Sequence, residues 1–251
     1  MAGSTAEKPN IRFFSGNSLE AELDAAMERI RAYGVTYPEG YGRILLKKYT
    51  EEGVRYPHIL MILGRPRINH HSCYPRLFGQ PGRFLDYGCG TGDNIRQLIR
   101  DGFPRERITA FDINGDSIGL GLDLYRDGEA MDNLFVVSDR FPFGNREFGI
   151  VYSASVIHVI ADDREFRAYL ENAYSVLRYG GVFFGSTLGL KEGASRSPDA
   201  RGPPRILTAG QLESALTCAG FRQPAIVRRN GVPGYVPGSG DLCVLEFSTG
   251  K

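Results

Sequence analysis

Three glycines at alternate positions form the part of this sequence best suited to binding a ligand. They are Gly88, Gly90 and Gly92. An apolar run that ends at Asp86 precedes them, so a strand, a glycine turn and a helix N-terminus would bring backbone N–H groups close to a ligand. A second apolar run ends at Asp112, and a carboxylate there can accept hydrogen bonds from both hydroxyl groups of a ribose. The spacing predicts a site for a ligand with a ribose and an anionic or zwitterionic tail.

The spacing of the glycines distinguishes between classes of nucleotide ligand. The dinucleotide fingerprint reads G-x-G-x-x-G, whereas this chain reads G-x-G-x-G. Asp93 occupies the position of the third fingerprint glycine, where its carboxylate would face a pyrophosphate unfavourably. The alternative is an ordinary glycine-rich turn between a strand and a helix, which the placement of Asp112 disfavours. The pattern therefore argues against a dinucleotide.

Composition limits the architecture and the class of partner. With 251 residues, the chain is long enough for one α/β domain with additions. A formal net charge of +1 argues against a dedicated nucleic-acid binder, which carries a basic surface. No apolar run approaches the roughly 20 residues of a membrane span, and the polar N-terminus lacks a secretory signal. The four cysteines form no C-x-x-C pair, so we expect reduced thiols in a cytoplasmic protein that contacts neither nucleic acid nor membrane.

The N-terminal third is helical in pattern and shows no alternation of strands and helices. After a polar tail over residues 1–16, apolar residues recur every three or four positions from Leu19 to Tyr33, which predicts a helix. A second helical piece and an irregular stretch follow. We expect residues 1–80 to form an N-terminal tail and a helical cap over the site.

Strands and helices alternate in the rest of the chain, which indicates a parallel sheet covered on both faces. The first five predicted strands are 83–88, 107–112, 134–138, 148–152 and 182–187. The predicted helices are 92–101, 116–127, 163–178 and 208–219. Two last strands, 225–228 and 242–247, are joined without a helix and must be antiparallel. We expect residues 81–251 to form the core, with a mobile loop at 189–204.

From Phe84 to about Phe247, this order of signals resembles the class I S-adenosylmethionine (SAM)-dependent methyltransferases of the small-molecule type. The resemblance implies an α/β fold with a seven-stranded, mostly parallel sheet of order 3-2-1-4-5-7-6, whose last strand is antiparallel. It implies SAM as the cofactor and S-adenosylhomocysteine as the product. In this family the glycine turn receives the methionine end of SAM, whose ammonium tolerates nearby carboxylates.

The resemblance also assigns residues to the cofactor site. Asp86 and the three glycines match the family's first motif, Asp112 matches the acid that binds the ribose, and Asp139 matches the acid that binds the adenine amino group. The complete set expected at the cofactor is Asp86, Gly88, Cys89, Gly90, Gly92, Asn94, Asp112, Ile113, Ser138, Asp139, Arg140 and Ser153. Phe148-Gly149 and Tyr179-Gly180 depart from the family pattern at positions that do not touch the cofactor.

Methyl transfer from a sulfonium is an in-line displacement, so the protein mainly has to align the reacting atoms, which can contribute roughly 7–11 kcal/mol. Where a hydroxyl must lose its proton, a general base adds about 10²–10⁴-fold. His158 follows the fourth strand and is the candidate base, with a hydrogen-bonding or packing role as the alternative. His70 and His71 have no further ligands at workable spacing, so we expect no metal site.

Acceptor specificity lies outside the resemblance, because it commonly resides in the N-terminal part of these enzymes. Candidates to bind an acidic acceptor are Arg65, Arg67 and Arg76, with solvated loop arginines as the alternative. Candidates to line an aromatic pocket, or to fill a cap interface, are Tyr33, Tyr37, Tyr41 and Tyr49. Candidates for a lid, or for an ordinary surface loop, are Lys191, Arg196 and Arg201.

The leading prediction is a SAM-dependent methyltransferase that acts on an oxygen or nitrogen nucleophile of a small-molecule metabolite. The chain lacks an Asn-Pro-Pro-Tyr or Asp-Pro-Pro-Tyr motif after the fourth strand, which disfavours the nucleic-acid and protein methyltransferases that use it. A SAM-binding protein that catalyses another reaction, such as a cyclisation, is the first alternative. A non-catalytic partner subunit is the second, and the intact acids of the cofactor motif argue against it.

Overall fold

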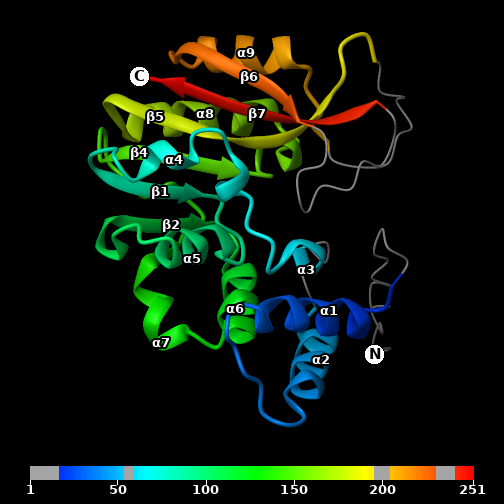
Figure 1. Ribbon diagram of the computed structural model, residues 1–251. Helices are drawn as coiled ribbons and strands as arrows, with labels where there is room; N and C mark the ends of the chain where they lie inside the picture. The colour runs from blue at the N-terminus through cyan, green and yellow to red at the C-terminus, as the bar shows by residue number, and fades with distance from the viewer. Residues whose placement is uncertain (1–16, 54–58, 195–203, 230–240) are drawn as a thin grey trace, which may run out of the picture.

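A seven-stranded sheet forms the centre of the molecule (Figure 1). The computed structural model describes residues 17–53, 59–194, 204–229 and 241–251. The strands are β1 (Arg83–Tyr87), β2 (Ile108–Asp112), β3 (Phe135–Val137), β4 (Phe148–Ala154), β5 (Leu177–Leu190), β6 (Arg222–Arg229) and β7 (Leu242–Gly250). Their order is β3-β2-β1-β4-β5-β7-β6, and only β7 runs antiparallel to its neighbours, β5 and β6. The predicted sheet is confirmed.

Helices cover both faces of this sheet. The longer ones in the core are α5 (Asp93–Arg100), α6 (Gly115–Tyr125), α8 (Asp163–Val176) and α9 (Ala209–Cys218). The short ones are η2 (Arg105–Arg107), α7 (Gly128–Met131), η3 (Asp132–Leu134) and η4 (Ile157–Val159). Successive residues of β1 belong to different apolar clusters: Phe84 packs with Ile95 of α5, and Leu85 packs with Leu170 of α8. Such alternation is expected for a strand whose two faces are both buried.

The first three helices pack against α6, at the end of the molecule opposite α9 and β6 (Figure 1). They are α1 (Leu19–Arg31), α2 (Tyr41–Glu52) and α3 (Ile59–Ile62). The short helices η1 (Ile68–His70) and α4 (Tyr74–Leu77) follow and pack with α5 and the sheet. Leu23 of α1 and Leu45 of α2 belong to one apolar cluster with Leu124 of α6. The side chain of Ser18 caps α1 by accepting a hydrogen bond from Ala21 N at 3.2 Å.

Of the four tyrosines proposed above for a pocket or a cap interface, three donate hydrogen bonds to α6 from their hydroxyl groups. Tyr37 donates to Leu124 O at 2.6 Å, and Tyr41 donates to Asp123 O at 2.8 Å. Tyr49 donates to the carboxylate of Asp123 at 2.6 Å. The fourth, Tyr33, packs edge-on against Tyr125 of the same helix. These contacts are those of an interface between the N-terminal helices and the core.

β5 is longer than its apolar run predicts. It begins at Leu177, which pairs with Phe148 of β4, and it continues to Leu190, which pairs with Leu242 of β7. Residues 189 and 190 therefore belong to the sheet and not to the predicted loop. The N-terminal tail (1–16), most of that loop with Arg196 and Arg201, and the Gly/Pro-rich connection before β7 lie outside the described residues.

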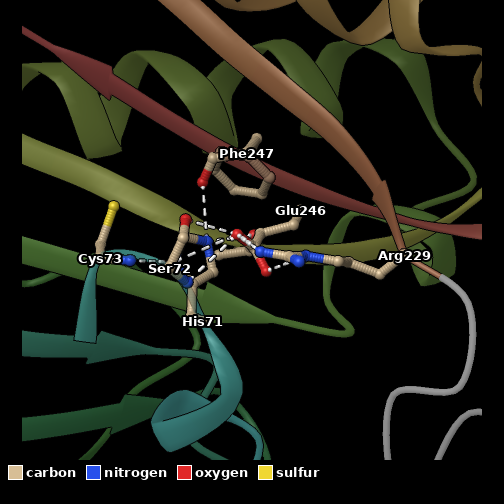
Figure 2. Close-up of polar contacts among 7 residues, drawn as sticks. His71, Ser72, Cys73, Arg229, Glu246 and Phe247 are labelled. Carbon is tan, nitrogen blue, oxygen red and sulfur yellow. Dashed lines mark hydrogen bonds and ion pairs between the residues drawn. The ribbon is translucent and has the colours of Figure 1, made fainter. Parts of the chain in front are cut away.

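A buried polar cluster fixes the segment after η1 to β5 and β7 (Figure 2). His71 donates from Nε2 to the carbonyl oxygens of Gly185 and Phe247, both at 3.1 Å, and its Nδ1 accepts from Cys73 N at 3.0 Å. Ser72 donates from both its N–H and its hydroxyl to Glu246 of β7, at 3.2 and 2.5 Å. Both ring nitrogens of His71 are thus used to hold the chain.

Candidate cofactor site

The glycine turn between β1 and α5 requires its three glycines. All three have left-handed backbones, with φ of +84° at Gly88, +56° at Gly90 and +76° at Gly92. A Cβ atom on Gly88 would lie 2.2 Å from Val156 Cγ2, and one on Gly92 would lie 2.7 Å from Phe135 Cζ. Side chains are therefore excluded at Gly88 and Gly92, and the backbone of the turn can approach a ligand closely.

Asp112, at the end of β2, lies against this turn as the sequence predicts. Its carboxylate accepts hydrogen bonds from Gly90 N at 2.8 Å and from Asn114 N at 2.9 Å. The acid therefore supports the shape of the glycine turn as well as lying beside it. Its contact with a ribose stays a prediction.

Asp86, at the end of β1, is a buried carboxylate without a protein partner. Its exposed fraction is 0%, and neither carboxylate oxygen has a hydrogen-bond partner among the described residues. Burial and, to a smaller extent, the negative charge of Asp112 raise the pKa of Asp86 to about 8, although the positive charge of Arg67 lowers it. A buried polar group without a partner is unfavourable, so the site fits a ligand that brings a cation or a hydrogen-bond donor. The ammonium group of SAM meets this requirement.

Two exposed apolar side chains lie at the carboxyl ends of β2 and β3. Ile113 is 57% exposed and Val137 is 53% exposed. The two strand ends are adjacent, since a Cβ atom on Gly115 would lie 3.5 Å from Val137 Cγ1. An adenine ring can pack against such apolar groups. The sequence analysis included Ile113 and missed Val137, although an apolar residue at the last position of a strand is a signal for it.

The segment after β3 lies at the same edge of the sheet. Asp139 and Arg140 are exposed, and the hydroxyl of Ser138 accepts a hydrogen bond from Arg140 N at 3.2 Å. The carboxylate of Asp139 is therefore accessible to a ligand. Its contact with the adenine amino group stays a prediction.

Three of the predicted cofactor residues make structural contacts with their side chains. Asn94 Oδ1 accepts from the backbone N–H groups of Arg67 and Ile68, at 3.0 and 3.2 Å. Ser153 forms a buried hydrogen bond between its hydroxyl and that of Tyr169. Cys89 is buried, which raises the pKa of its thiol. Cofactor contacts by these residues stay predictions.

Asp93 organises the site, and the sequence analysis considered it only as an obstacle to a pyrophosphate. The carboxylate of this first residue of α5 accepts from Gly64 N and from the hydroxyl of Tyr125, both at 2.6 Å, and from the hydroxyl of Thr91. It connects the glycine turn, the N-terminal segment and α6. The available signal was an acid in the first turn of a helix, where negative charge is favourable.

His158, in η4, is buried and neutral. Its Nδ1 accepts a hydrogen bond from Leu188 N at 3.3 Å and lies 3.1 Å from the hydroxyl oxygen of Thr187. Burial and, to a smaller extent, the charge of Arg67 lower the pKa of His158 to about 3. These contacts favour the hydrogen-bonding role over the general base. The base role stays a prediction.

The three candidate arginines have different environments. Arg65 and Arg76 are exposed, as expected for solvated loop arginines. Arg67 is only 9% exposed and donates from its guanidinium to the hydroxyl of Ser155, just after β4. For Arg67 the solvated alternative is wrong, because the loop carries this side chain into the protein.

One of the two departures from the family pattern, Gly149, is explained by close packing, since a Cβ atom there would lie 2.1 Å from Pro81 O. The backbone before β1 therefore approaches β4 too closely for the larger residue usual in the family. The other departure, Tyr179, is exposed, and its hydroxyl accepts a hydrogen bond from the guanidinium of Arg146 at 2.8 Å. These contacts lie at the amino ends of the strands, away from the glycine turn.

Comparison with known proteins agrees with this geometry. Residues 84–181 match a family described as a methyltransferase domain. Methyltransferase adrK of Penicillium rubens is 30% identical over 110 residues, which cover 40% of this chain and 40% of that protein. O-methyltransferase phiE of a fungal species is 27% identical over 109 residues, or 39% of this chain and 36% of that protein. The matches thus span about two fifths of the length of these relatives.

Solved structures share the fold over a larger part of the chain. Geranyl diphosphate methyltransferase in complex with SAM has a TM-score of 0.58 at 13% identity, covering 79% of this chain and 91% of that chain. The [4+2]-cyclase SpnF has a TM-score of 0.55 at 18% identity, covering 78% and 81%. At these identities the likeness shows the fold alone. The chain therefore has the fold of these proteins, and residues 84–181 within it match the methyltransferase domain.

Proposed function

We propose that this protein transfers a methyl group from SAM to an oxygen or nitrogen atom of a small-molecule metabolite. The observation that carries the proposal is the carboxyl group of Asp86, which has no hydrogen-bond partner among the described residues and precedes a turn in which Gly88 and Gly92 leave no room for a Cβ atom. SAM supplies a methyl carbon bonded to a sulfonium. Transfer of this methyl group to the acceptor would leave S-adenosylhomocysteine, and the proton of the O–H or N–H acceptor would pass to solvent.

The residues of the chain bind and orient the cofactor in this proposal. Asp86 pairs with the ammonium of the methionine end, and Asp112 accepts hydrogen bonds from the ribose hydroxyl groups. Ile113 and Val137 pack against the adenine, and the carboxylate of Asp139 accepts a hydrogen bond from the adenine amino group. Alignment of the reacting atoms is then the main contribution of the protein to the rate.

The name of one relative, an O-methyltransferase, favours oxygen as the atom that is methylated. The cyclase with the same fold is an example of the alternative, in which the protein catalyses a reaction other than methyl transfer. The two curated relatives described above are both methyltransferases. We therefore propose methyl transfer to oxygen first and to nitrogen second.

We also propose that the N-terminal segment covers the acceptor. The proposal is supported by Ile59 of α3, whose Cδ1 lies 3.3 Å from the position of a Cβ atom on Gly90, and by the contact of Arg67 with Ser155. Closure over the site would exclude water during transfer.

Among the described residues, no helix is long and apolar enough to cross a membrane. The four cysteines are free thiols, which favours the proposed cytoplasmic location.

Binding of S-adenosylhomocysteine, followed by calorimetry, tests the cofactor part of the proposal. Asp112→Ala should weaken binding at least about tenfold, because a hydrogen bond to a charged group contributes roughly 1.5–3 kcal/mol. Asp116→Ala is the matched control, since Asp116 is exposed in the first turn of α6. Undiminished affinity in Asp112→Ala would show that Asp112 is not the ribose acid.

Incubation with SAM and a metabolite extract tests the reaction. A product heavier by one methyl group, formed only with the active protein, is the expected result. Cofactor binding without any methylated product would favour the cyclisation alternative.

A further inference from the structure

Arg67 is a buried cation at the edge of the sheet where the cofactor site lies. Its guanidinium donates to the hydroxyl of Ser155, the first residue after β4. Arg65, two residues earlier, is exposed, so the two arginines of this segment differ in burial. Burying a guanidinium costs free energy unless charged or polar groups compensate for the lost water.

The backbone that carries Arg67 is fixed to α5. Asn94 Oδ1 accepts from the N–H groups of Arg67 and Ile68, at 3.0 and 3.2 Å. Three residues earlier, Gly64 N donates to the carboxylate of Asp93 at 2.6 Å. Two side chains at the start of one helix therefore determine where this guanidinium lies.

Ser155, the hydroxyl partner of Arg67, has an unusual backbone conformation. Its φ is +62°, in the left-handed region that residues other than glycine rarely adopt. Its N–H donates to Ser186 O of β5 at 2.9 Å, which holds the turn against the sheet. Strained backbone of this kind is often found where a side chain has to be placed for binding.

We propose that Arg67 and Ser155 form a subsite for a carboxylate group of a bound ligand. A guanidinium presents parallel N–H donors that match the two oxygens of a carboxylate, and a serine hydroxyl can add a third donor. The proposal rests on the proposed function, since it concerns the ligands of the same site.

The charges around the subsite agree with this assignment. The positive charge of Arg67 lowers the pKa of both Asp86 and His158, so the guanidinium acts on the end of β1 and on η4. The site thus combines the buried carboxyl group of Asp86, which can ionise to pair with an ammonium, with the buried cation of Arg67. Such a pair suits a ligand that carries an ammonium and a carboxylate, or two ligands that carry one each.

Two ligands could supply the carboxylate: the amino-acid end of the cofactor, or an acidic acceptor. Arg67→Met removes the guanidinium and keeps much of the apolar stem. Arg65→Met is the matched control, with the same change of charge two residues away at an exposed position. Circular dichroism and the thermal midpoint establish that each variant is folded.

The first experiment compares S-adenosylhomocysteine with 5′-methylthioadenosine, which lacks the amino-acid end. If the cofactor supplies the carboxylate, Arg67→Met should lower the affinity for S-adenosylhomocysteine roughly 10- to 100-fold. Its affinity for 5′-methylthioadenosine should stay within twofold of the wild type. Arg65→Met should bind both ligands as the wild type does. An equal loss for both ligands in Arg67→Met would contradict a carboxylate subsite.

The second experiment compares benzoate with benzamide, in the presence of saturating S-adenosylhomocysteine. If an acceptor supplies the carboxylate, the wild type and Arg65→Met should bind benzoate at least about tenfold more tightly than benzamide, and Arg67→Met should bind the two equally. The proposal is overturned if Arg67→Met matches Arg65→Met in both experiments. A wild-type protein that does not bind S-adenosylhomocysteine would instead overturn the proposed function.

Discussion

Two buried acids, Asp86 and Glu246, differ in whether the surrounding residues form hydrogen bonds with them. Asp86, at the end of β1, has an exposed fraction of 0% and no hydrogen-bond partner among the described residues. Glu246, within β7, is 5% exposed and accepts from Ser72 and, at 3.1 and 3.2 Å, from Arg229. The first region, around Asp86, is the proposed ligand site, and the contacts of the second, around Glu246, hold the N-terminal segment to the sheet.

The pKa values of the two acids express this difference. Burial raises the pKa of both groups. At Glu246 the hydrogen bonds from Arg229 and Ser72 outweigh burial, so its pKa lies below the usual value. At Asp86 no hydrogen bond opposes burial, and the pKa reaches about 8. A buried acid whose partner must come from outside the chain therefore indicates a binding site better than burial alone does.

The largest expected effect tests whether a ligand binds in the first region at all. Gly90→Val places a β-branched side chain at φ +56°, with its Cβ 3.3 Å from Ile59 Cδ1. The backbone could then no longer approach a ligand, so affinity for S-adenosylhomocysteine should fall at least about 100-fold. Gly210→Val in α9, where a Cβ meets nothing within 4 Å, is the control for calorimetry. Undiminished affinity in Gly90→Val would remove the glycine turn from the cofactor site.

Asp86→Asn tests the unpartnered acid directly. Without the negative charge, the affinity for S-adenosylhomocysteine should fall roughly 10- to 100-fold, since a hydrogen bond between charged groups is lost. The ligand-free variant should melt at a higher temperature than the wild type at about pH 8, because a buried charge without a partner is removed. Calorimetry and thermal unfolding give the two measurements. Loss of both affinity and stability would mean that Asp86 has a structural partner.

Glu246→Gln is the counterpart in the second region and should give the opposite pattern. It removes the charge that Arg229 and Ser72 bind, so the free energy of unfolding should fall by about 1–3 kcal/mol. The affinity of the folded protein for S-adenosylhomocysteine should stay within about twofold of the wild type. Denaturant unfolding at pH 7 measures the first quantity. A large loss of affinity in this variant would show that the two regions are coupled.

The sequence predicted the first region better than the second. The glycine turn, Asp86 and Asp112 are adjacent to strands in the chain, so local patterns reveal them. Glu246 meets Ser72 across 174 positions of the sequence, and no local pattern reports such a contact. The strand order was predicted because a resemblance supplied it. The packing of the N-terminal helices on α6, and the burial of Arg67 in a segment of similar arginines, depend on tertiary contacts that spacing does not encode.

The pH dependence of S-adenosylhomocysteine binding tests the difference between Asp86 and Glu246 through a smaller change in affinity. Below its pKa of about 8, Asp86 is protonated in the free protein, and it must ionise to pair with an ammonium. Affinity for S-adenosylhomocysteine should therefore rise with pH towards about 8, by at most about tenfold per unit, and then level off. Calorimetry between about pH 6 and 8.5 measures it, and Asp86→Asn should flatten the curve.

The same ionisation has the opposite effect on the stability of the ligand-free protein. The unfolded chain ionises Asp86 near 3.8, whereas the folded protein keeps the proton until about 8. The contribution of Asp86 to stability is therefore present at low pH and is lost as pH rises between these values. Affinity that rises with pH together with stability that falls would be characteristic of an acid reserved for a ligand. A flat wild-type affinity profile would contradict the raised pKa.

The smallest effect is expected at His158, and it distinguishes a hydrogen-bonding role from a catalytic one. With a pKa of about 3, His158 is neutral at every pH at which the enzyme is assayed, so turnover should show no inflection near pH 6.5. Asn can replace Nδ1 as the acceptor for Leu188 N, whereas Ala cannot. His158→Asn should therefore retain turnover within about threefold, and His158→Ala should lose about tenfold, while affinity for SAM changes little in either. A general base would behave differently, because both variants would then lose at least about 100-fold in turnover and the wild-type profile would show the titration of the imidazole.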